Sequence, residues 1–196
     1  MSDIIQQAMQ DLATQNAVTR GLAIFCAVVV VYLLGAGWAA IIVAGRARVT
    51  IAVVARVIAL AALAFVASTV LTGIVIDPRP YVVAHAQPLI PVGHDNGFPS
   101  DHTLLAATLA ASVWWIDRRW LAAFAVGTVL VGLGRLGIGA HHTLDIAGSV
   151  AIAVVAAVII ARIPLPAAWD RVIVPRRGQA GATGSVRPSR ISSRHR

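Results

Sequence analysis

Five long apolar stretches run along the chain, separated by short segments that carry most of its polar side chains. The stretches cover residues 21–45, 57–76, 100–116, 120–139 and 143–163, and they lack the polar stripe of a soluble amphipathic helix. About 20 apolar residues suffice for a helix to cross a bilayer, where lipid offers the backbone no hydrogen-bond partners. The pattern therefore predicts an all-α polytopic membrane bundle with five transmembrane helices.

A shorter and more polar segment precedes the first stretch. Ile4, Ile5, Met9 and Leu12 recur at helical spacing, with Gln and Asp side chains between them. This pattern predicts a short interfacial helix that lies on the membrane surface and is too polar to span it. The first apolar stretch is too long for the core of a signal peptide, so we expect no cleavage.

Composition supports a membrane protein and argues against a nucleic-acid partner. The chain of 196 residues is 58% hydrophobic, and its mean hydropathy is +0.81. Its net charge is +8, but seven of its 16 arginines follow Trp169, and no aromatic residues interleave with them. We therefore expect one membrane-embedded domain over residues 1–175 and a disordered basic tail over 176–196. Cys26 is the single cysteine, which excludes an intrachain disulfide.

The distribution of arginine predicts the orientation. Short loops rich in arginine remain in the cytoplasm, and tryptophan gathers at membrane interfaces. Arginines gather in the first and third connections and after the fifth stretch: Arg46, Arg48, Arg56, Arg118, Arg119, Arg162, Arg171, Arg176 and Arg177. The five tryptophans map to the same side. This side and the tail should be cytoplasmic, which places the second and fourth connections outside.

These two outer connections, residues 77–102 and 135–145, hold nearly all the remaining ionisable side chains. Ionisable residues beside a membrane are costly and usually functional. His141 and Asp145 are four residues apart at the start of the last helix, so the carboxylate can fix the tautomer of the imidazole. The other ring nitrogen then carries a lone pair, as a histidine nucleophile requires. His142, three residues from Asp145, is a competing candidate.

The residues ahead of the third stretch are suited to binding phosphate. Ser100 follows Pro99 and is a predicted N-cap, and helix N-termini bind phosphate through free backbone N–H groups. His102 lies in the same first turn, where it can act as a general acid. Arg79 and Arg135 add two planar guanidinium groups that match phosphate oxygens.

At these residues the chain resembles the type-2 phosphatidic acid phosphatase (PAP2) superfamily. The family pattern reads K-x6-RP, then PSGH, then SR-x5-H-x3-D. The matching residues are Arg79-Pro80, Pro99-Ser100-Asp101-His102, and Arg135 with His141 and Asp145. The spacing of the third part selects His141 over His142.

The resemblance implies a mechanism that needs no metal or other cofactor. By that resemblance His141 attacks phosphorus and forms a phosphohistidine, Asp145 orients it, and His102 protonates the leaving oxygen. Fixed arginine charges take the stabilising role that a metal ion plays elsewhere. Three residues would hold the phosphate: Arg79, Arg135 and Ser100.

The chain departs from the family pattern at three positions. Thr72 stands where the family has Lys, and Gly134 replaces the Ser before Arg135. Asp101 replaces the Gly of PSGH, and the resulting FPSDH resembles the bacterial branch that acts on undecaprenyl diphosphate. The resemblance thus implies a phosphatase of the bacterial cytoplasmic membrane that recycles a cell-wall carrier lipid, with its site facing outward. The family usually has six spans, so a sixth helix remains open.

Several alternatives remain open from the sequence. Phosphatidylglycerol phosphate, phosphatidic acid, lipid A or a decaprenyl phosphoribose are other possible substrates within the family. A metal site is a second class, because the outer connections contain these ligand types: His85, His94, His102, His141, His142 and Asp145. A noncatalytic lipid-binding protein with a degenerate site is a third, encouraged by Thr72. The sequence leaves the oligomeric state undetermined.

Overall fold

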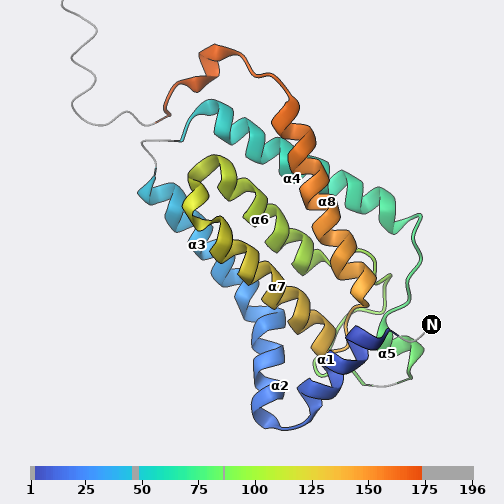
Figure 1. The fold of residues 1–196 in the computed structure, drawn as a ribbon. Coiled ribbons are helices and arrows are strands. Elements are labelled where there is room, and N and C mark those ends of the chain that lie inside the picture. Colours follow the sequence, from blue (N-terminus) through green and yellow to red (C-terminus); the bar gives the residue numbers. More distant parts are fainter. Residues whose placement is uncertain (1–2, 46–48, 86, 174–196) are drawn as a thin grey trace, which may run out of the picture.

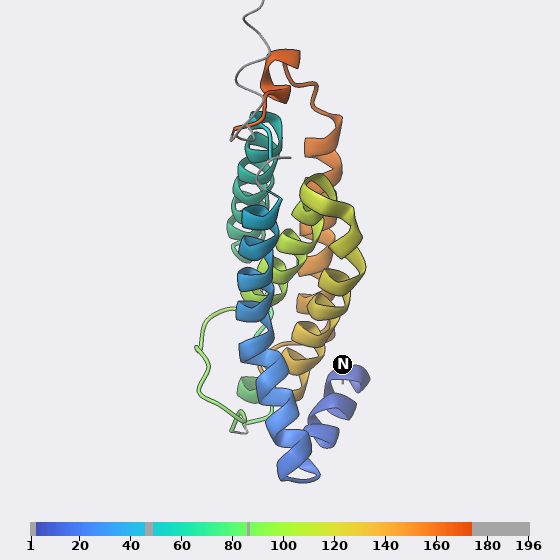
Figure 2. The same cartoon turned by 90° about the vertical axis from the view of Figure 1, so that its left-hand side faces the viewer.

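The computed structural model describes residues 3–45, 49–85 and 87–173, and within them the chain is helical without any strand (Figures 1 and 2). The α-helices are α1 Ile4–Thr14, α2 Ala17–Ile24, α3 Val30–Ala44, α4 Ile51–Thr72, α5 Pro80–Val83, α6 Asp101–Asp117, α7 Leu121–Gly137 and α8 Thr143–Arg162. Shorter turns are the π-helix η1 Phe25–Val29 and the 3-10 helices η3 Arg118–Trp120 and η4 Ala167–Asp170. The tail predicted at 176–196 lies outside the described residues.

Four helical stretches of the described residues are long and apolar enough to cross a membrane: Ala17–Ala44, Ile51–Thr72, Asp101–Gly137 and Thr143–Arg162. The first is a continuous helical segment in which the π-helical turn η1 connects α2 to α3. The third reverses direction at η3, so that α6 and α7 lie side by side (Figure 1). The five predicted spans thus correspond to α2–α3, α4, α6, α7 and α8, and the predicted all-α polytopic membrane bundle is confirmed.

The second span begins earlier than predicted, because Arg56 lies inside α4 rather than in the preceding loop. Thr50 caps the helix by accepting from the backbone N–H of Val53 at 3.3 Å. The guanidinium of Arg56 donates to the carbonyl of Ile160 at 3.0 Å, near the end of α8. The last carbonyls of a helix lack intrahelical donors, so they are free to accept hydrogen bonds from the Arg56 guanidinium. The arginine can therefore lie within an otherwise apolar helix. Arg46 and Arg48 lie outside the described residues.

Helix α6 is the centre of the bundle and contacts α3, α4, α7 and α8. Its buried face consists of small or medium side chains such as Ala106, Ala110 and Val113, which let neighbouring backbones approach closely. Larger side chains point outward, and Phe65 on α4 is 70% exposed. An apolar outer surface of this kind suits a bundle surrounded by lipid tails.

The predicted N-terminal helix is present as α1, and it packs against α2 and α7. Gln6 is buried, whereas Ile4, Ile5 and Leu12 are exposed. The helix therefore turns an amide side chain toward the protein and apolar side chains outward. It lies at the end of the bundle where α5, the end of α7 and the start of α8 also gather (Figures 1 and 2).

Candidate active site

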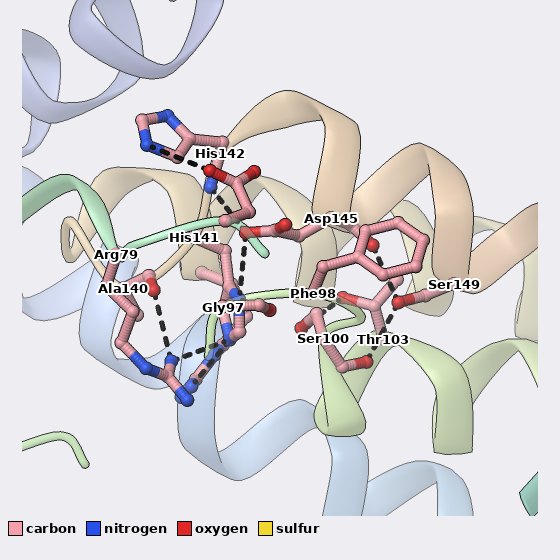
Figure 3. A network of polar contacts seen from close by, with 12 residues as sticks. Arg79, Gly97, Phe98, Ser100, Thr103, Ala140, His141, His142, Asp145 and Ser149 are labelled. Atoms are coloured by element: carbon pink, nitrogen blue, oxygen red, sulfur yellow. Dashed lines mark hydrogen bonds and ion pairs between the residues drawn. The ribbon is translucent and has the colours of Figure 1, made fainter. Parts of the chain in front are cut away.

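His141 lies in the short connection between α7 and α8, and its side chain is only 2% exposed. Its Nδ1 is 2.9 Å from the carbonyl oxygen of Gly97 and 3.3 Å from Oδ2 of Asp145 (Figure 3). A carbonyl and a carboxylate can only accept, so Nδ1 carries the proton. Nε2 therefore presents a lone pair.

Two guanidinium groups point at this lone pair. Nη1 of Arg79 is 3.2 Å and Nη2 of Arg135 is 3.1 Å from Nε2 of His141. Burial lowers the pKa of His141 to about 3, and the positive charges of Arg135 and Arg79 contribute to this shift. His141 is therefore neutral near pH 7, the form in which an imidazole is nucleophilic.

Arg79 precedes α5, and groups on two loops fix its position. Nη1 also donates to the carbonyl of Ala140 at 3.1 Å, and Nε donates to the carbonyl of Asp95 at 3.2 Å. Nη2 forms an ion pair of 2.9 Å with the carboxylate of Asp95, which is 72% exposed. Arg79 thus reaches His141 in a fixed geometry.

Arg135 extends from the last turn of α7 and is also buried. Its Nε has no hydrogen-bond partner among the described residues. A buried donor without a partner is uncommon in proteins, and each case calls for an explanation. Because Nε is buried, Arg135 meets the cavity through its Nη groups, of which Nη2 points at His141.

The two arginines, His102 and His141 meet at one cavity of about 340 Å³. His102 is half-buried in the first turn of α6. Val28 of η1, the loop 90–93, Asp95 and Asp101 complete the lining. The structure therefore brings four of the six predicted site residues to the same cavity.

The other two predicted residues lie behind the cavity rather than on its wall. Asp145 is fully buried, touches His141, and accepts from the backbone N–H of His142 at 2.8 Å. Ser100 stands at the N-cap position of α6, as predicted, but its hydroxyl is fully buried and accepts from Thr103 at 3.2 Å. Its carbonyl accepts from Ser149 at 3.0 Å.

The competing candidate, His142, faces away from the cavity. Its Nδ1 is 3.6 Å from Oδ2 of Asp3, and its Nε2 is 3.8 Å from Oδ1 of Asp77. It occupies the N-cap position of α8. Of the two adjacent histidines, only His141 lines the cavity with the arginines.

Sequence reasoning missed the segment just before Phe98. The Asn96 amide donates to the carbonyls of Thr72 at 2.9 Å and Val75 at 2.6 Å, which ties the end of α4 to this loop. A Cβ at Gly97 would lie 2.9 Å from the carbonyl oxygen of Asp77, so only glycine fits there. Asn-Gly is a turn signal, and this one directly precedes the FPSDH segment.

The other histidines do not form a metal cluster. Within the described part of the chain, no three His, Cys, Asp or Glu side chains are grouped so that they could hold a metal ion. The Tyr81 hydroxyl is 3.2 Å from Nδ1 of His94, and His85 is exposed. Among the described residues, the histidines and carboxylates named for the metal-site alternative therefore form no group of three.

The model of the PAP2 superfamily matches residues 52–169, which is more than half of the chain. The chain belongs to the PAP2 superfamily. It is also similar to the undecaprenyl-diphosphatase BcrC of Bacillus subtilis (strain 168), with 31% identity over 85 residues. That match covers 43% of this chain and 44% of the relative, so it spans less than half of either protein. No solved structure matches the chain.

The structure gives a physical reason for one departure from the PAP2 pattern. A Cβ at Gly134 would lie 2.7 Å from the carbonyl carbon and 2.8 Å from the Cβ of Cys26, and closer still to the backbone nitrogen of Ala27. These atoms belong to η1, which crosses α7 at this point. The PAP2 serine does not fit against η1 in this arrangement.

The two other PAP2 departures differ in their relation to the cavity. The Thr72 hydroxyl donates to the carbonyl of Ser68 at 2.9 Å, and Thr72 is not among the residues that line the cavity. Asp101, which replaces the PAP2 glycine, is exposed and does line it. Asp101 therefore adds an acidic residue to the cavity, whereas Thr72 contributes no charge to the site.

Proposed function

We propose that this PAP2 protein is an integral membrane lipid phosphatase that hydrolyses undecaprenyl diphosphate to the monophosphate and inorganic phosphate. The observation that carries the proposal is the position of His141 Nε2, which accepts from Arg79 at 3.2 Å and Arg135 at 3.1 Å at a cavity that His102 also lines. A neutral nucleophile beside two fixed cations suits phosphoryl transfer, because the cations stabilise the negative charge of the phosphoryl oxygens.

In the first step the lone pair of His141 Nε2 attacks the terminal phosphorus. The phosphate oxygens take over the hydrogen bonds that Nη1 of Arg79 and Nη2 of Arg135 make with Nε2 in the free protein. The bond from phosphorus to the bridging oxygen breaks, and His102 donates a proton to the leaving undecaprenyl phosphate. The product on the protein is a phosphohistidine whose Nδ1–H remains bonded to Gly97 and Asp145.

In the second step water attacks the phosphohistidine. His102, now neutral, accepts the proton of that water, the N–P bond breaks, and inorganic phosphate leaves. Asp145 and the Gly97 carbonyl stabilise the positive charge that the ring carries during both steps. Arg79 and Arg135 supply the charge that a metal ion supplies in other phosphatases, so we propose that no metal is required.

The arrangement of the bundle supports an outward-facing site. Arg118 and Arg119 lie in η3, between the end of α6 and the start of α7, whereas the cavity is lined by residues at the start of α6 and the end of α7. These are opposite ends of the two helices (Figure 1). Because arginine-rich turns remain in the cytoplasm, the cavity would face the outer side of the bacterial cytoplasmic membrane. Carrier lipid released as the diphosphate during cell-wall synthesis is exposed on that side.

Two observations support a polyprenyl diphosphate as substrate. Asp101 lies at the cavity in the position that distinguishes FPSDH from PSGH. The Bacillus subtilis relative, whose name describes an undecaprenyl-diphosphatase, is 31% identical to the chain over 85 residues. Both observations concern the identity of the substrate, whereas the geometry of His141 concerns the phosphoryl-transfer reaction.

The test is phosphate release from undecaprenyl diphosphate by the purified protein in detergent, with and without EDTA. We expect release that survives EDTA, disappears in His141→Ala, and is retained in His85→Asn. His85 is a matched control because it is exposed at the same end of the bundle, and its positive φ of 50° suits asparagine.

The possible results separate the parts of the proposal. Turnover of phosphatidic acid or phosphatidylglycerol phosphate without turnover of the diphosphate would keep the chemistry and reject the substrate. Loss of activity in EDTA would reject metal independence. Absence of turnover on all three lipids would reject these substrates and favour a noncatalytic lipid-binding protein.

A further inference from the structure

Helix α1 lies outside residues 52–169, the part of the chain that matches the PAP2 superfamily, yet it contacts the end of the bundle that holds the site. Buried Gln6 donates to the side chain of Gln10 at 2.7 Å. A Cβ at Gly139 would lie 3.0 Å from Nε2 of Gln10, so this amide packs directly on the turn before His141. Figure 2 shows α1 folded back against the end of α7.

A single carboxylate, that of Asp3, joins α1 to α8. Its Oδ1 accepts from the backbone N–H of Gln6 at 3.0 Å, which caps α1, and from the hydroxyl of Thr143 at 2.8 Å. Its Oδ2 accepts from the backbone N–H of Thr143 at 2.6 Å. First-turn N–H groups lack intrahelical acceptors, so Asp3 serves the starts of two helices at once.

The contact is close to the nucleophile in the chain. Thr143 is the first residue of α8, two positions after His141 and two before Asp145. Asp3 itself is not among the residues that line the cavity. Partial burial alone would raise the pKa of Asp3, but the hydrogen bonds from Thr143 and Gln6 together lower it by more. The pKa therefore lies below its usual value, and the group is a carboxylate at neutral pH.

We propose that Asp3 is a positioning residue of the active site, which fixes the backbone at Thr143 and thereby holds His141 Nε2 in line for attack. The inference rests on the phosphatase function proposed above. Because Asp3 is separate from the phosphate-binding arginines, its loss lowers the rate of attack and leaves substrate binding unchanged. A nucleophile that departs from its geometry by a fraction of an ångström loses rate without losing affinity.

The variant Asp3→Asn tests this role without removing the cap of α1. Asparagine keeps one oxygen for the N–H of Gln6 but places an amide N–H₂ opposite the N–H of Thr143. We expect kcat to fall about tenfold while KM stays within about twofold of wild type. Asp11→Asn is the matched control: Asp11 is an exposed aspartate of the same helix, and its carboxylate has no partner within the described part of the chain.

Amide hydrogen exchange gives a second measurement that is independent of activity. Peptides spanning residues 138–146 should exchange faster in Asp3→Asn than in wild type or Asp11→Asn. Wild-type kcat in Asp3→Asn, a change in KM alone, or unchanged exchange would overturn the inference. If wild type releases no phosphate, the proposed function fails, and the exchange data then decide by themselves whether Asp3 holds the start of α8.

Discussion

Replacing Asp145 by asparagine tests how His141 is held in its reactive tautomer. The Nδ1 proton has two acceptors, the Gly97 carbonyl at 2.9 Å and the Asp145 carboxylate at 3.3 Å. The carbonyl is the closer acceptor and is part of the backbone. We therefore expect the tautomer to persist in Asp145→Asn, so that the variant loses only the negative charge.

The expected loss follows from that difference. A hydrogen bond to a charged group contributes about 1.5–3 kcal/mol, which corresponds to a decrease of roughly ten- to hundredfold in kcat. In a Ser-His-Asp triad the carboxylate itself selects the tautomer, and the same substitution costs about 10⁴-fold. Asp145→Asn should therefore be clearly impaired but should remain measurably active.

The assay is initial-rate phosphate release from undecaprenyl diphosphate at several substrate concentrations. Helical content and melting temperature in detergent would verify that the fully buried Asp145 tolerates the substitution. A folded variant that loses about 10⁴-fold would show that the carboxylate, and not Gly97, fixes the tautomer. A variant as active as wild type would show that the charge of Asp145 has no role in the reaction.

Three further substitutions or conditions give distinct outcomes. The pKa of His141 is lowered to about 3 by burial and the two arginines, so acidification from about pH 6.5 toward 3 should protonate the unfolded chain first and lower the melting temperature. His141→Gln should flatten this pH dependence, and equal slopes would contradict the assigned pKa. Partial burial works to raise the pKa of Asp95, but its bond with Arg79 holds the pKa below its usual value. Asp95→Asn should free that arginine for phosphate and lower KM about two- to fivefold, the scale of an exposed ion pair, whereas a raised KM would show that Asp95 positions Arg79. Gly134→Ser, although it restores the family residue, should lower the melting temperature because its side chain meets Cys26 at 2.8 Å, and a stable, more active variant would refute this packing argument.

The sequence predicted the bundle because membrane insertion depends on local properties. Apolar stretches of sufficient length must form helices in lipid, and the described spans follow the predicted ones closely except at the start of α4. Arg56 caused that error, because its partner, the carbonyl of Ile160, is distant in the chain. The pattern of apolar residues in a segment shows which of its side chains are buried. It does not show which distant group forms a hydrogen bond with a charged side chain such as Arg56.

The sequence also determined the chemical identity of the candidate site. The spacing of Arg135, His141 and Asp145 carries the family pattern, and the four-residue separation of His141 and Asp145 predicted their contact, now seen at 3.3 Å. Arg79 and His102 were predicted from residue type and order, and both line the cavity.

Only the tertiary structure decided how these groups are held. Three contacts hold them, and each joins residues that are distant in the chain. The Gly97 carbonyl binds Nδ1 of His141 across 44 positions, and the Asp95 carboxylate binds Arg79 across 16. Asp3 binds Thr143 across 140 positions. Backbone acceptors and loop carboxylates of this kind leave no periodic signal in a sequence. Their partners are set by the packing of separate helices. The sequence could therefore predict the reactive residues and the neighbouring Asp145, but not these three distant contacts.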